Sequence, residues 1–419
     1  MSSVLKYYEY AKEIYASIGV DTQKAIDTLR SVPISLHCWQ GDDVTGFENL
    51  SQSLTGGIMA TGNYPGKPNT PSQLRDDLSL ALSLIPGEKK VNVHALYIEP
   101  TKGNPDRDEI SPEHFGSWVD FAKDKNIGLD FNPSFFSHVK SESGFTLSSH
   151  DKAIRDFWIE HGKRSRKVGE HFGKSTGKTC ITNIWIPDGY KDFPIDKSAP
   201  REYLLDSLNK MREEKIDPHF NKDAVESKVF GIGSEAYVTG SHEFYMGYAI
   251  KTGDCLLCLD AGHFHPEEKI SSKISSMLLF IDELLLHVSR PLRWDSDHVV
   301  LYDDELQAIM SEVVRLDALN KIYIALDYFD ASINRIAAWV IGARNTSKAL
   351  LRALLEPVND LKRLEVEGDW TSRLALTEEY KTYPFNAVWD YYCEISGMPV
   401  RDNWLKDIKK YENDVLSNR

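Results

Sequence analysis

The chain has 419 residues, of which 41% are hydrophobic and 27% charged, so its composition is that of a folded globular protein. Its 49 Lys and Arg against 63 Asp and Glu give a net charge of −14, which disfavours binding to nucleic acid. No apolar run reaches the roughly 18 residues that a membrane span needs, and the N-terminus lacks a signal-peptide pattern. We therefore expect a cytoplasmic protein whose partner is neither nucleic acid nor membrane.

Short apolar runs alternate with helix-sized segments along the chain, which is typical of a parallel α/β sheet. Most of these runs end in, or directly precede, His, Asp, Glu, Lys or Trp. An open doubly wound sheet binds ligands mainly at one switch point, whereas a closed barrel draws catalytic groups from the carboxyl ends of many strands. The sequence therefore favours an α/β fold of the (β/α)8 TIM barrel type. The predicted strands are 34–39, 91–97, 128–132, 180–186, 224–230, 256–260, 284–288 and 323–327.

The segments outside the barrel also carry predictions. The first thirty residues indicate one or two helices before the first strand, and residues 56–68 predict a long loop that could cover a site. We expect residues 1–335 to form the barrel with the functional site and residues 336–419 to form a helical C-terminal extension. That extension exceeds what barrel closure needs, so it is either an oligomerisation arm or a cap on its own barrel.

Five cysteines are spread thinly through the chain, an odd number that fits reduced thiols better than a disulfide framework. Cys255 and Cys258 have the spacing of a redox or zinc motif, but they lie within an apolar run that predicts a buried strand. We therefore expect both to be buried structural thiols.

The strongest chemical signal follows the sixth predicted strand. Asp260 and His263 lie three residues apart, and a carboxylate and an imidazole at such spacing are common metal ligands. An Asp that caps the next helix and pairs with the His would explain this segment equally well.

A second acidic pair follows the seventh predicted strand. Asp295 and Asp297 would project to the same side of an extended segment, where two like charges call for a cation, although an exposed acidic turn has the same pattern. His287 lies within the preceding apolar run, where a single His is more often a core residue than a ligand.

The fifth and eighth predicted strands add further charged groups. Glu226 and Lys228 lie two residues apart on one face, and both are costly in a strand unless a polar site or a plain ion pair holds them. Asp327 ends the eighth strand and Asp330 follows closely.

Considered together, these side chains predict two metal ions. Five carboxylates carry five negative charges, which two divalent ions and one ammonium group balance when the imidazoles bind as neutral ligands. Carboxylate and imidazole ligands without thiolate suit Mn²⁺, Mg²⁺ or Co²⁺ better than a structural Zn²⁺. The predicted ligands are Glu226, Asp260, His263, His287, Asp295, Asp297 and Asp327.

Several longer motifs are spread over essentially the whole chain. They are 34–44 (ISLHCWQGDDV), 130–133 (DFNP), 241–248 (SHEFYMGY), 259–266 (LDAGHFHP), 286–291 (LHVSRP), 293–300 (RWDSDHVV) and 330–342 (DASINRIAAWVIG). By these motifs the chain resembles a known family, the L-rhamnose isomerases, which are relatives of the xylose isomerases, and the similarity is highly specific.

The resemblance implies a barrel with two divalent metals, usually Mn²⁺, assembled as a homotetramer. Lys228 matches the lysine that hydrogen-bonds the carbonyl oxygen of the substrate, a sugar such as L-rhamnose. His94 and Trp185 end the second and fourth predicted strands, where they are placed to line the sugar pocket. The resemblance assigns Glu226, Asp260, His287 and Asp327 to a structural metal site, and His263, Asp295 and Asp297 to a catalytic one, with Asp260 able to bridge the two.

The predicted activity is that of an aldose–ketose isomerase, which interconverts L-rhamnose and L-rhamnulose by a metal-assisted hydrogen shift between C2 and C1. Lys228 would stabilise charge on O1, and Asp327 or Asp330 would move a proton, with a hydride shift and an enediol route both open. Two competing classes are a metal-dependent sugar epimerase, which inverts a stereocentre, and a barrel metal hydrolase, which turns over a phosphodiester or lactone.

Overall fold

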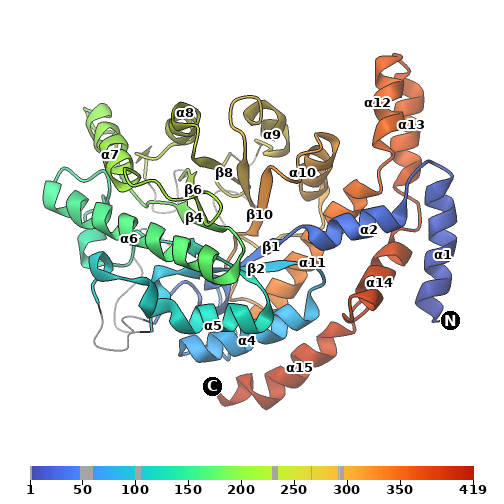
Figure 1. Ribbon diagram of the computed structural model, residues 1–419, viewed down its shortest axis with the longest axis horizontal. Coiled ribbons are helices and arrows are strands. Elements are labelled where there is room, and N and C mark those ends of the chain that lie inside the picture. The colour runs from blue at the N-terminus through green and yellow to red at the C-terminus, as the bar shows by residue number, and fades with distance from the viewer. Residues whose placement is uncertain are drawn as a thin grey trace.

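The computed structural model describes residues 2–47, 60–99, 105–228, 235–265, 267–290, 292 and 297–419. Within these ranges eight parallel strands close into a barrel in the order β1-β10-β9-β8-β6-β4-β3-β2 (Figure 1). The predicted TIM barrel is confirmed, and every predicted run contains or overlaps one of these strands. They are β1 (Ile34–His37), β2 (Lys89–His94), β3 (Gly128–Asn132), β4 (Cys180–Ile184), β6 (Asn221–Glu226), β8 (Leu256–Asp260), β9 (Leu284–Val288) and β10 (Ile322–Leu326).

Side chains on the barrel strands alternate between the helix layer and the barrel interior, as the two-residue period of a strand requires. On β8, Leu257 and Leu259 belong to the main hydrophobic core, whereas Leu256 and Cys258 belong to a separate buried cluster. Asp260 is the next residue in that second row, at the carboxyl end of the strand. The row therefore changes from apolar to charged at the end of the barrel where TIM barrels hold their sites.

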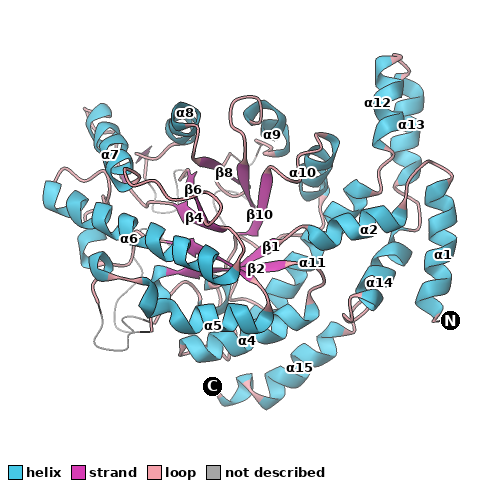
Figure 2. Cartoon of the chain, viewed as in Figure 1, coloured by secondary structure: helices cyan, strands magenta, loops and turns pink. Residues whose placement is uncertain are grey.

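A helix follows each barrel strand, and these helices surround the barrel in Figure 2. Local sequence sets their ends. For example, the Asp151 side chain accepts a hydrogen bond from Ala153 N at the start of α6, and Gly177 with φ 68° ends it. The surrounding helices are α4 (Pro71–Leu84), α5 (Gly116–Lys125), α6 (Lys152–Thr176), α7 (Ser198–Met211), α8 (His242–Thr252), α9 (Ser271–Met277), α10 (Asp304–Arg315) and α11 (Arg335–Leu354).

The remaining helices lie at the two ends of the chain and in the connections. In Figure 1 the hairpin of α12 and α13 stands out from the body, and the N-terminal α1 packs beside α14. The division into residues 1–335 and 336–419 stays a prediction, although the helical character of the C-terminal segment is confirmed. These elements are α1 (Ser3–Ala16), α2 (Thr22–Ser31), α3 (Trp39–Asp42), α12 (Val358–Val366), α13 (Trp370–Tyr380), α14 (Phe385–Ile395) and α15 (Trp404–Asp414), with short 3₁₀ helices at Ala95–Tyr97, Arg107–Glu109, Pro112–Phe115, Val139–Ser141 and Leu416–Asn418.

Two short strands outside the barrel join the connections that follow β4 and β6. They are β5 (Gly189–Tyr190) and β7 (Tyr237–Val238), which pair antiparallel, with Gly189 opposite Val238 and Tyr190 opposite Tyr237. This small sheet ties together two loops at the carboxyl ends of neighbouring barrel strands.

The structure corrects one strand boundary that bears on the site. The fifth predicted strand, 224–230, is β6 over Asn221–Glu226, so Lys228 lies beyond the strand and not within it. The predicted loop 56–68 lies partly outside the described residues. All five cysteines are buried and free, which confirms the prediction for Cys255 and Cys258. Among the described helices, none combines the length and apolar character needed to cross a membrane.

Candidate metal centre

Four neighbouring strand ends bring the central acidic and imidazole groups together. Glu226 ends β6, Asp260 ends β8, His287 is the fourth residue of β9, and Asp327 directly follows β10. The parallel register places Asp260 opposite His287 on adjacent strands. All four residues are buried, with at most 8% of their surface exposed. Interior-facing positions at the carboxyl ends of adjacent strands converge in a barrel, so these side chains meet.

The first ligand group consists of Glu226, Asp260, His287 and Asp327. One ligand atom from each of these side chains lies within 4.8 Å of the others. His287 Nδ1 lies 2.8 Å from Asp327 Oδ2 and 3.3 Å from both Glu226 Oε1 and Asp260 Oδ2. The structure therefore brings together the four residues that the sequence analysis assigned to one site.

The second ligand group consists of Asp260, His263 and Asp297, whose ligand atoms also lie within 4.8 Å of one another. Gly262 allows this close approach, because a Cβ on it would lie 2.8 Å from Asp297 Oδ1 and 3.2 Å from Asp260 Oδ1. Its backbone N–H donates to Asp260 Oδ1 at 2.6 Å. Asp260 thus belongs to both groups, whereas Asp295 lies outside the described residues.

The electrostatics of the first group show strong competition among acidic neighbours. Burial raises the pKa of Asp260 to about 8, and the negative charges of Asp327 and Glu226 add to this rise. Burial also favours a higher pKa for Glu226 and Asp327. The attraction of the positive His287 ring is stronger than this effect and lowers the pKa of both carboxyls. Burial alone would lower the pKa of His287, but the acidic groups around the ring raise it well above its usual value.

The donor set fits a divalent cation. Glu226 Oε1, Asp260 Oδ2 and His287 Nε2 are buried and form no hydrogen bond with another described residue. Buried polar atoms are normally satisfied, so atoms of this kind that face one another indicate a ligand. Carboxylate and imidazole donors are the ligands that Mn²⁺, Mg²⁺ and related ions take in proteins. The site is therefore suited to metal binding.

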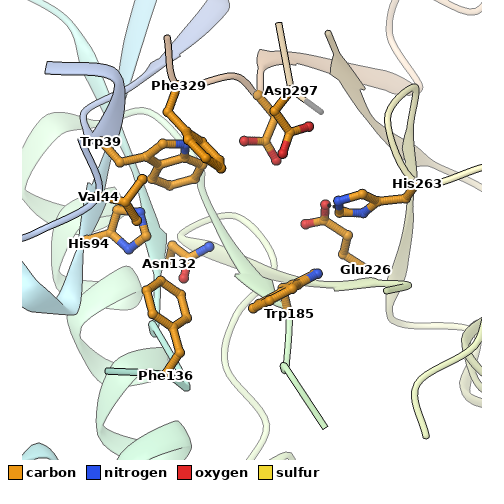
Figure 3. A pocket seen from close by; sticks show the side chains of 11 residues that line it. Trp39, Val44, His94, Asn132, Phe136, Trp185, Glu226, His263, Asp297 and Phe329 are labelled. Carbon is orange, nitrogen blue, oxygen red and sulfur yellow. Dashed lines mark ion pairs between the residues drawn. The ribbon is translucent and has the colours of Figure 1, made fainter. Parts of the chain in front are cut away.

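A pocket opens beside the ligand groups. Figure 3 shows Trp39, His94 and Phe329 on one side of it and Glu226, His263 and Asp297 on the other. Such a cavity, with apolar rings facing a few convergent polar groups, is typical of a small-molecule site. The full lining is Trp39, Val44, His94, Asn132, Phe136, Trp185, Glu226, His263, Asp297, Asp327 and Phe329.

The two predicted pocket residues both line this cavity. The His94 ring packs against Trp39 with the ring centroids 4.0 Å apart, and its Nδ1 contacts Ser134 Oγ. Burial lowers the pKa of His94 well below its usual value, so the ring is neutral. Trp185 is 7% exposed, and its buried Nε1–H meets no acceptor among the described residues. Its indole therefore offers a donor to whatever fills the pocket.

Two other predicted residues lie apart from the pocket lining. The Lys228 ammonium donates to Pro187 O at 2.8 Å and to Glu235 Oε1 at 2.6 Å. The Asp330 carboxylate accepts hydrogen bonds from the backbone N–H and the hydroxyl of Ser332. The structure thus brings His94, Trp185 and six of the seven predicted ligands together, but places Lys228 and Asp330 beside that set.

Sequence reasoning missed several contributors. His37 Nδ1 lies 3.4 Å from Asp327 Oδ1, and the Asn183 amide donates to Glu226 Oε2. Both are buried polar residues within predicted strands, and a polar residue inside such a run is the signal that could have found them. Other pocket residues that the sequence analysis did not assign to the site are Trp39, Val44, Asn132, Phe136 and Phe329.

A closed eight-stranded barrel with buried carboxylate and imidazole groups at its strand ends defines a barrel enzyme whose site is suited to metal binding. The family model described as L-rhamnose isomerase (RhaA) matches residues 2–419. The L-rhamnose isomerase of Listeria monocytogenes serotype 4a is 59% identical over 418 residues, covering 100% of this chain and 99% of the relative. Those of Mannheimia succiniciproducens (58%, covering 100% of both chains) and Escherichia coli O7:K1 (57%, covering 98% of both) are similar along their full lengths. The chain belongs to the L-rhamnose isomerase family, which confirms the resemblance found in the sequence.

Proposed function

We propose that this enzyme interconverts L-rhamnose and L-rhamnulose by a hydrogen shift between C2 and C1. The observation that carries the proposal is the pair of ligand groups that share Asp260 at one side of an aromatic-walled pocket. Sugars present apolar C–H faces and polar hydroxyls, and such a pocket complements both. The family of the chain and the names of its relatives give the substrate.

Two divalent ions, with Mn²⁺ favoured over Mg²⁺, Co²⁺ or Zn²⁺, complete this proposal. Two groups with one shared carboxylate are what a pair of neighbouring ions needs, and such ions would balance the negative charge of the buried carboxylates. When bound, they would supply Lewis-acid polarisation of the sugar oxygens. Glu226, Asp260, His287 and Asp327 would hold one ion, and Asp260, His263, Asp295 and Asp297 the other.

The protein's own side chains would orient the sugar and handle its proton. Trp185 and His94 form the wall of the pocket, and the buried Trp185 N–H is a donor for a sugar hydroxyl. Lys228 would donate to the carbonyl oxygen O1 and stabilise the charge that develops there. Asp327 is the carboxylate that we assign to moving the hydroxyl proton, since the Asp330 carboxylate is engaged by Ser332.

The activity is tested on metal-stripped protein incubated with L-rhamnose, with and without added Mn²⁺. We expect L-rhamnulose only in the samples with Mn²⁺, measured by chromatography of the sugars. Absence of a metal-dependent ketose would overturn the proposal, and inversion without ketose formation would indicate an epimerase. The same reaction in D₂O distinguishes the two routes, because solvent deuterium at C1 excludes a pure hydride shift.

The assembly and location follow from the same family membership. We propose a cytoplasmic homotetramer, and the free, buried cysteines fit a reducing compartment. On the projecting hairpin of α12 and α13, Val366 is 89% exposed, Trp370 55% and Leu374 58%, which suits an interface. Light scattering of the purified protein should give four times the chain mass of 47.6 kDa. A monomer would refute the assembly.

A further inference from the structure

The Lys228 ammonium is buried beside the pocket and is held from two sides. Only 1% of the Lys228 side chain is exposed, and the ammonium donates to Pro187 O and to Glu235 Oε1. Both anchors lie on connections that follow barrel strands, Pro187 after β4 and Glu235 after β6. The backbone N–H of Lys228 also donates to Gly240 O at 3.1 Å, which fixes the base of the side chain.

The small β5–β7 sheet sets the positions of both anchors. Pro187 lies two residues before β5, Glu235 lies two residues before β7, and the two strands are paired. Gly189 in β5 lies against Glu235, since a Cβ on it would be 3.2 Å from Glu235 Cγ and 2.8 Å from Tyr237 O. A side chain at position 189 would therefore displace Glu235 or β7.

A buried carboxylate fastens the connection that carries Pro187. Asp188 is fully buried and accepts four hydrogen bonds, from the backbone N–H and the hydroxyl of Thr146 and of Ser148. Its own carbonyl accepts from Thr239 N at 3.0 Å, just beyond β7. A carboxylate with this many donors is rigidly placed, so the Pro187 carbonyl next to it has little freedom.

The charge and the donor count of the ammonium indicate the purpose of these contacts. A buried ammonium without a counter-charge is strongly disfavoured, and Glu235 supplies that charge with 14% of its side chain exposed. An ammonium has three N–H donors, and two are used here. Glu226 lies two residues before Lys228, and Trp185 lies two residues before Pro187. Both Glu226 and Trp185 line the pocket. Among the described residues, the third N–H of the ammonium has no hydrogen-bond acceptor.

We propose that Glu235 is a positioning residue, which together with the Pro187 carbonyl holds the Lys228 ammonium ready to donate its third N–H to the reacting sugar oxygen. The inference rests on the proposed function and adds to it a residue outside the predicted site. Glu235 belongs to neither ligand group of the described residues and contacts the Lys228 ammonium, so we assign its effect on the reaction to Lys228.

The kinetic test compares the wild type with E235Q, E235D, G189A, K228M and the double variant K228M/E235Q, all saturated with Mn²⁺. We expect E235Q and G189A to lower kcat for L-rhamnose by about tenfold, with a much smaller change in KM, because a misplaced donor weakens transition-state stabilisation. E235D keeps the charge and should recover part of the loss. The matched control is E214Q, which removes an exposed Glu–Lys pair and should behave as the wild type.

The double variant separates a role through Lys228 from a general structural role. Residues that act as one unit are not additive, so K228M/E235Q should be no slower than K228M alone. An equal drop from E235Q in both backgrounds, or a wild-type kcat in E235Q, would overturn the proposal. Thermal melting of each variant identifies any that fails to fold, and G189A and E235Q then serve as independent probes of one contact.

Crystal structures of the wild type and E235Q test the geometry without any reaction. We expect the ammonium within hydrogen-bond distance of Pro187 O and Glu235 in the wild type, and displaced in E235Q. A wild type in which Lys228 and Glu235 are apart would overturn the positioning role. If the contact is present but L-rhamnose yields no ketose, the proposed function fails and the contact stands, so the two failures are distinguishable.

Discussion

Asp260 and His287 stand directly opposite each other in the register of β8 and β9, and Asp260 Oδ2 lies 3.3 Å from His287 Nδ1. Asp260 also lies within ligand distance of His263 and Asp297, which makes it common to both groups. A change at Asp260 therefore differs in kind from a change at His287, since only the former affects both groups.

We expect Asp260→Asn to reduce Mn²⁺ binding at both groups and to lower isomerisation by at least about 100-fold, because ligand loss costs more than loss of a supporting contact. His287→Asn should weaken only the first group. Bound Mn²⁺ per chain, measured by elemental analysis after equilibrium dialysis, distinguishes these outcomes. Asp156→Asn on the exposed face of α6 is the matched control. Full Mn²⁺ content in Asp260→Asn would contradict a shared ligand.

Trp185 combines an apolar wall with a buried donor, and its two contributions can be separated. Trp185→Phe removes the N–H and keeps a ring, so we expect a few-fold loss of kcat/KM for L-rhamnose. Trp185→Ala also removes the wall, and the loss should reach about tenfold or more. Steady-state kinetics of both variants check this, with the exposed Tyr10→Phe as control. Equal activity of Trp185→Ala and the wild type would exclude a role in the pocket.

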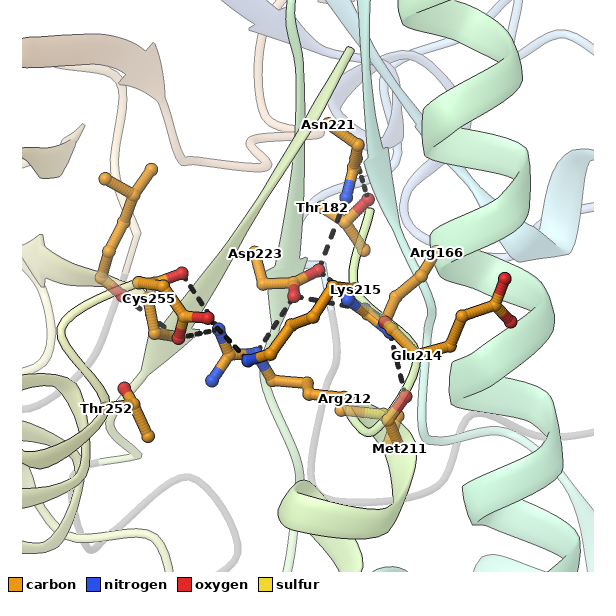
Figure 4. Close-up of polar contacts among 12 residues, drawn as sticks. Arg166, Thr182, Met211, Arg212, Glu214, Lys215, Asn221, Asp223, Thr252 and Cys255 are labelled. Carbon is orange, nitrogen blue, oxygen red and sulfur yellow. Dashed lines mark hydrogen bonds and ion pairs between the residues drawn. The ribbon is translucent and has the colours of Figure 1, made fainter. Parts of the chain in front are cut away.

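Asp223 joins two buried arginines on the outside of the barrel, as Figure 4 shows. Its carboxylate accepts from Arg166 Nε at 3.0 Å and from Arg212 Nε at 2.9 Å. Asp223→Ala leaves two buried guanidinium groups without this counter-charge, so we expect the free energy of unfolding to fall by about 3–5 kcal/mol. Denaturant melts measure it, and Asp206→Asn in an exposed pair of α7 should melt like the wild type. Unchanged stability of Asp223→Ala would show that the arginines find other partners.

Asp42 predicts a pH dependence of stability that arises away from the ligand groups. Burial raises its pKa to about 7, although Tyr97 OH and Gly46 N donate to the carboxylate. The ordinary value is 3.8, so between about pH 4 and pH 7 the folded chain binds a proton that the unfolded chain lacks. This contribution to stability is complete below pH 4 and is lost as the pH rises through 7.

The melting temperatures of the wild type and Asp42→Asn between pH 5 and pH 8 test this expectation. The amide is neutral throughout, and its single oxygen can replace only one of the two carboxylate oxygens that accept from Tyr97 and Gly46, so Asp42→Asn should be less stable at every pH but should lose less stability than the wild type as the pH rises. Parallel curves for the two proteins would show that Asp42 does not titrate in this range.

The strand pattern was sufficient to predict which residues meet at the carboxyl end of the barrel. Asp260 and Asp327 each close a predicted apolar run, His287 lies one residue before the end of another, and in a closed barrel all such ends converge. The sequence did not show which polar residues within the strands, such as His37, belong to the site. His37 reads as a core histidine, and only its 3.4 Å approach to Asp327 identifies it as a neighbour of the ligands.

By itself the sequence determined the barrel, the family and the residue types of the candidate metal centre, because alternation of apolar runs and the short spacing of Asp and His are local properties. The tertiary structure alone decided which of those groups face one another. Lys228 was expected beside Glu226 on one strand face, yet β6 ends at Glu226 and the ammonium is held by Glu235 and Pro187. Contacts between connections that follow different strands depend on how the chain closes in space, and no local pattern encodes that closure.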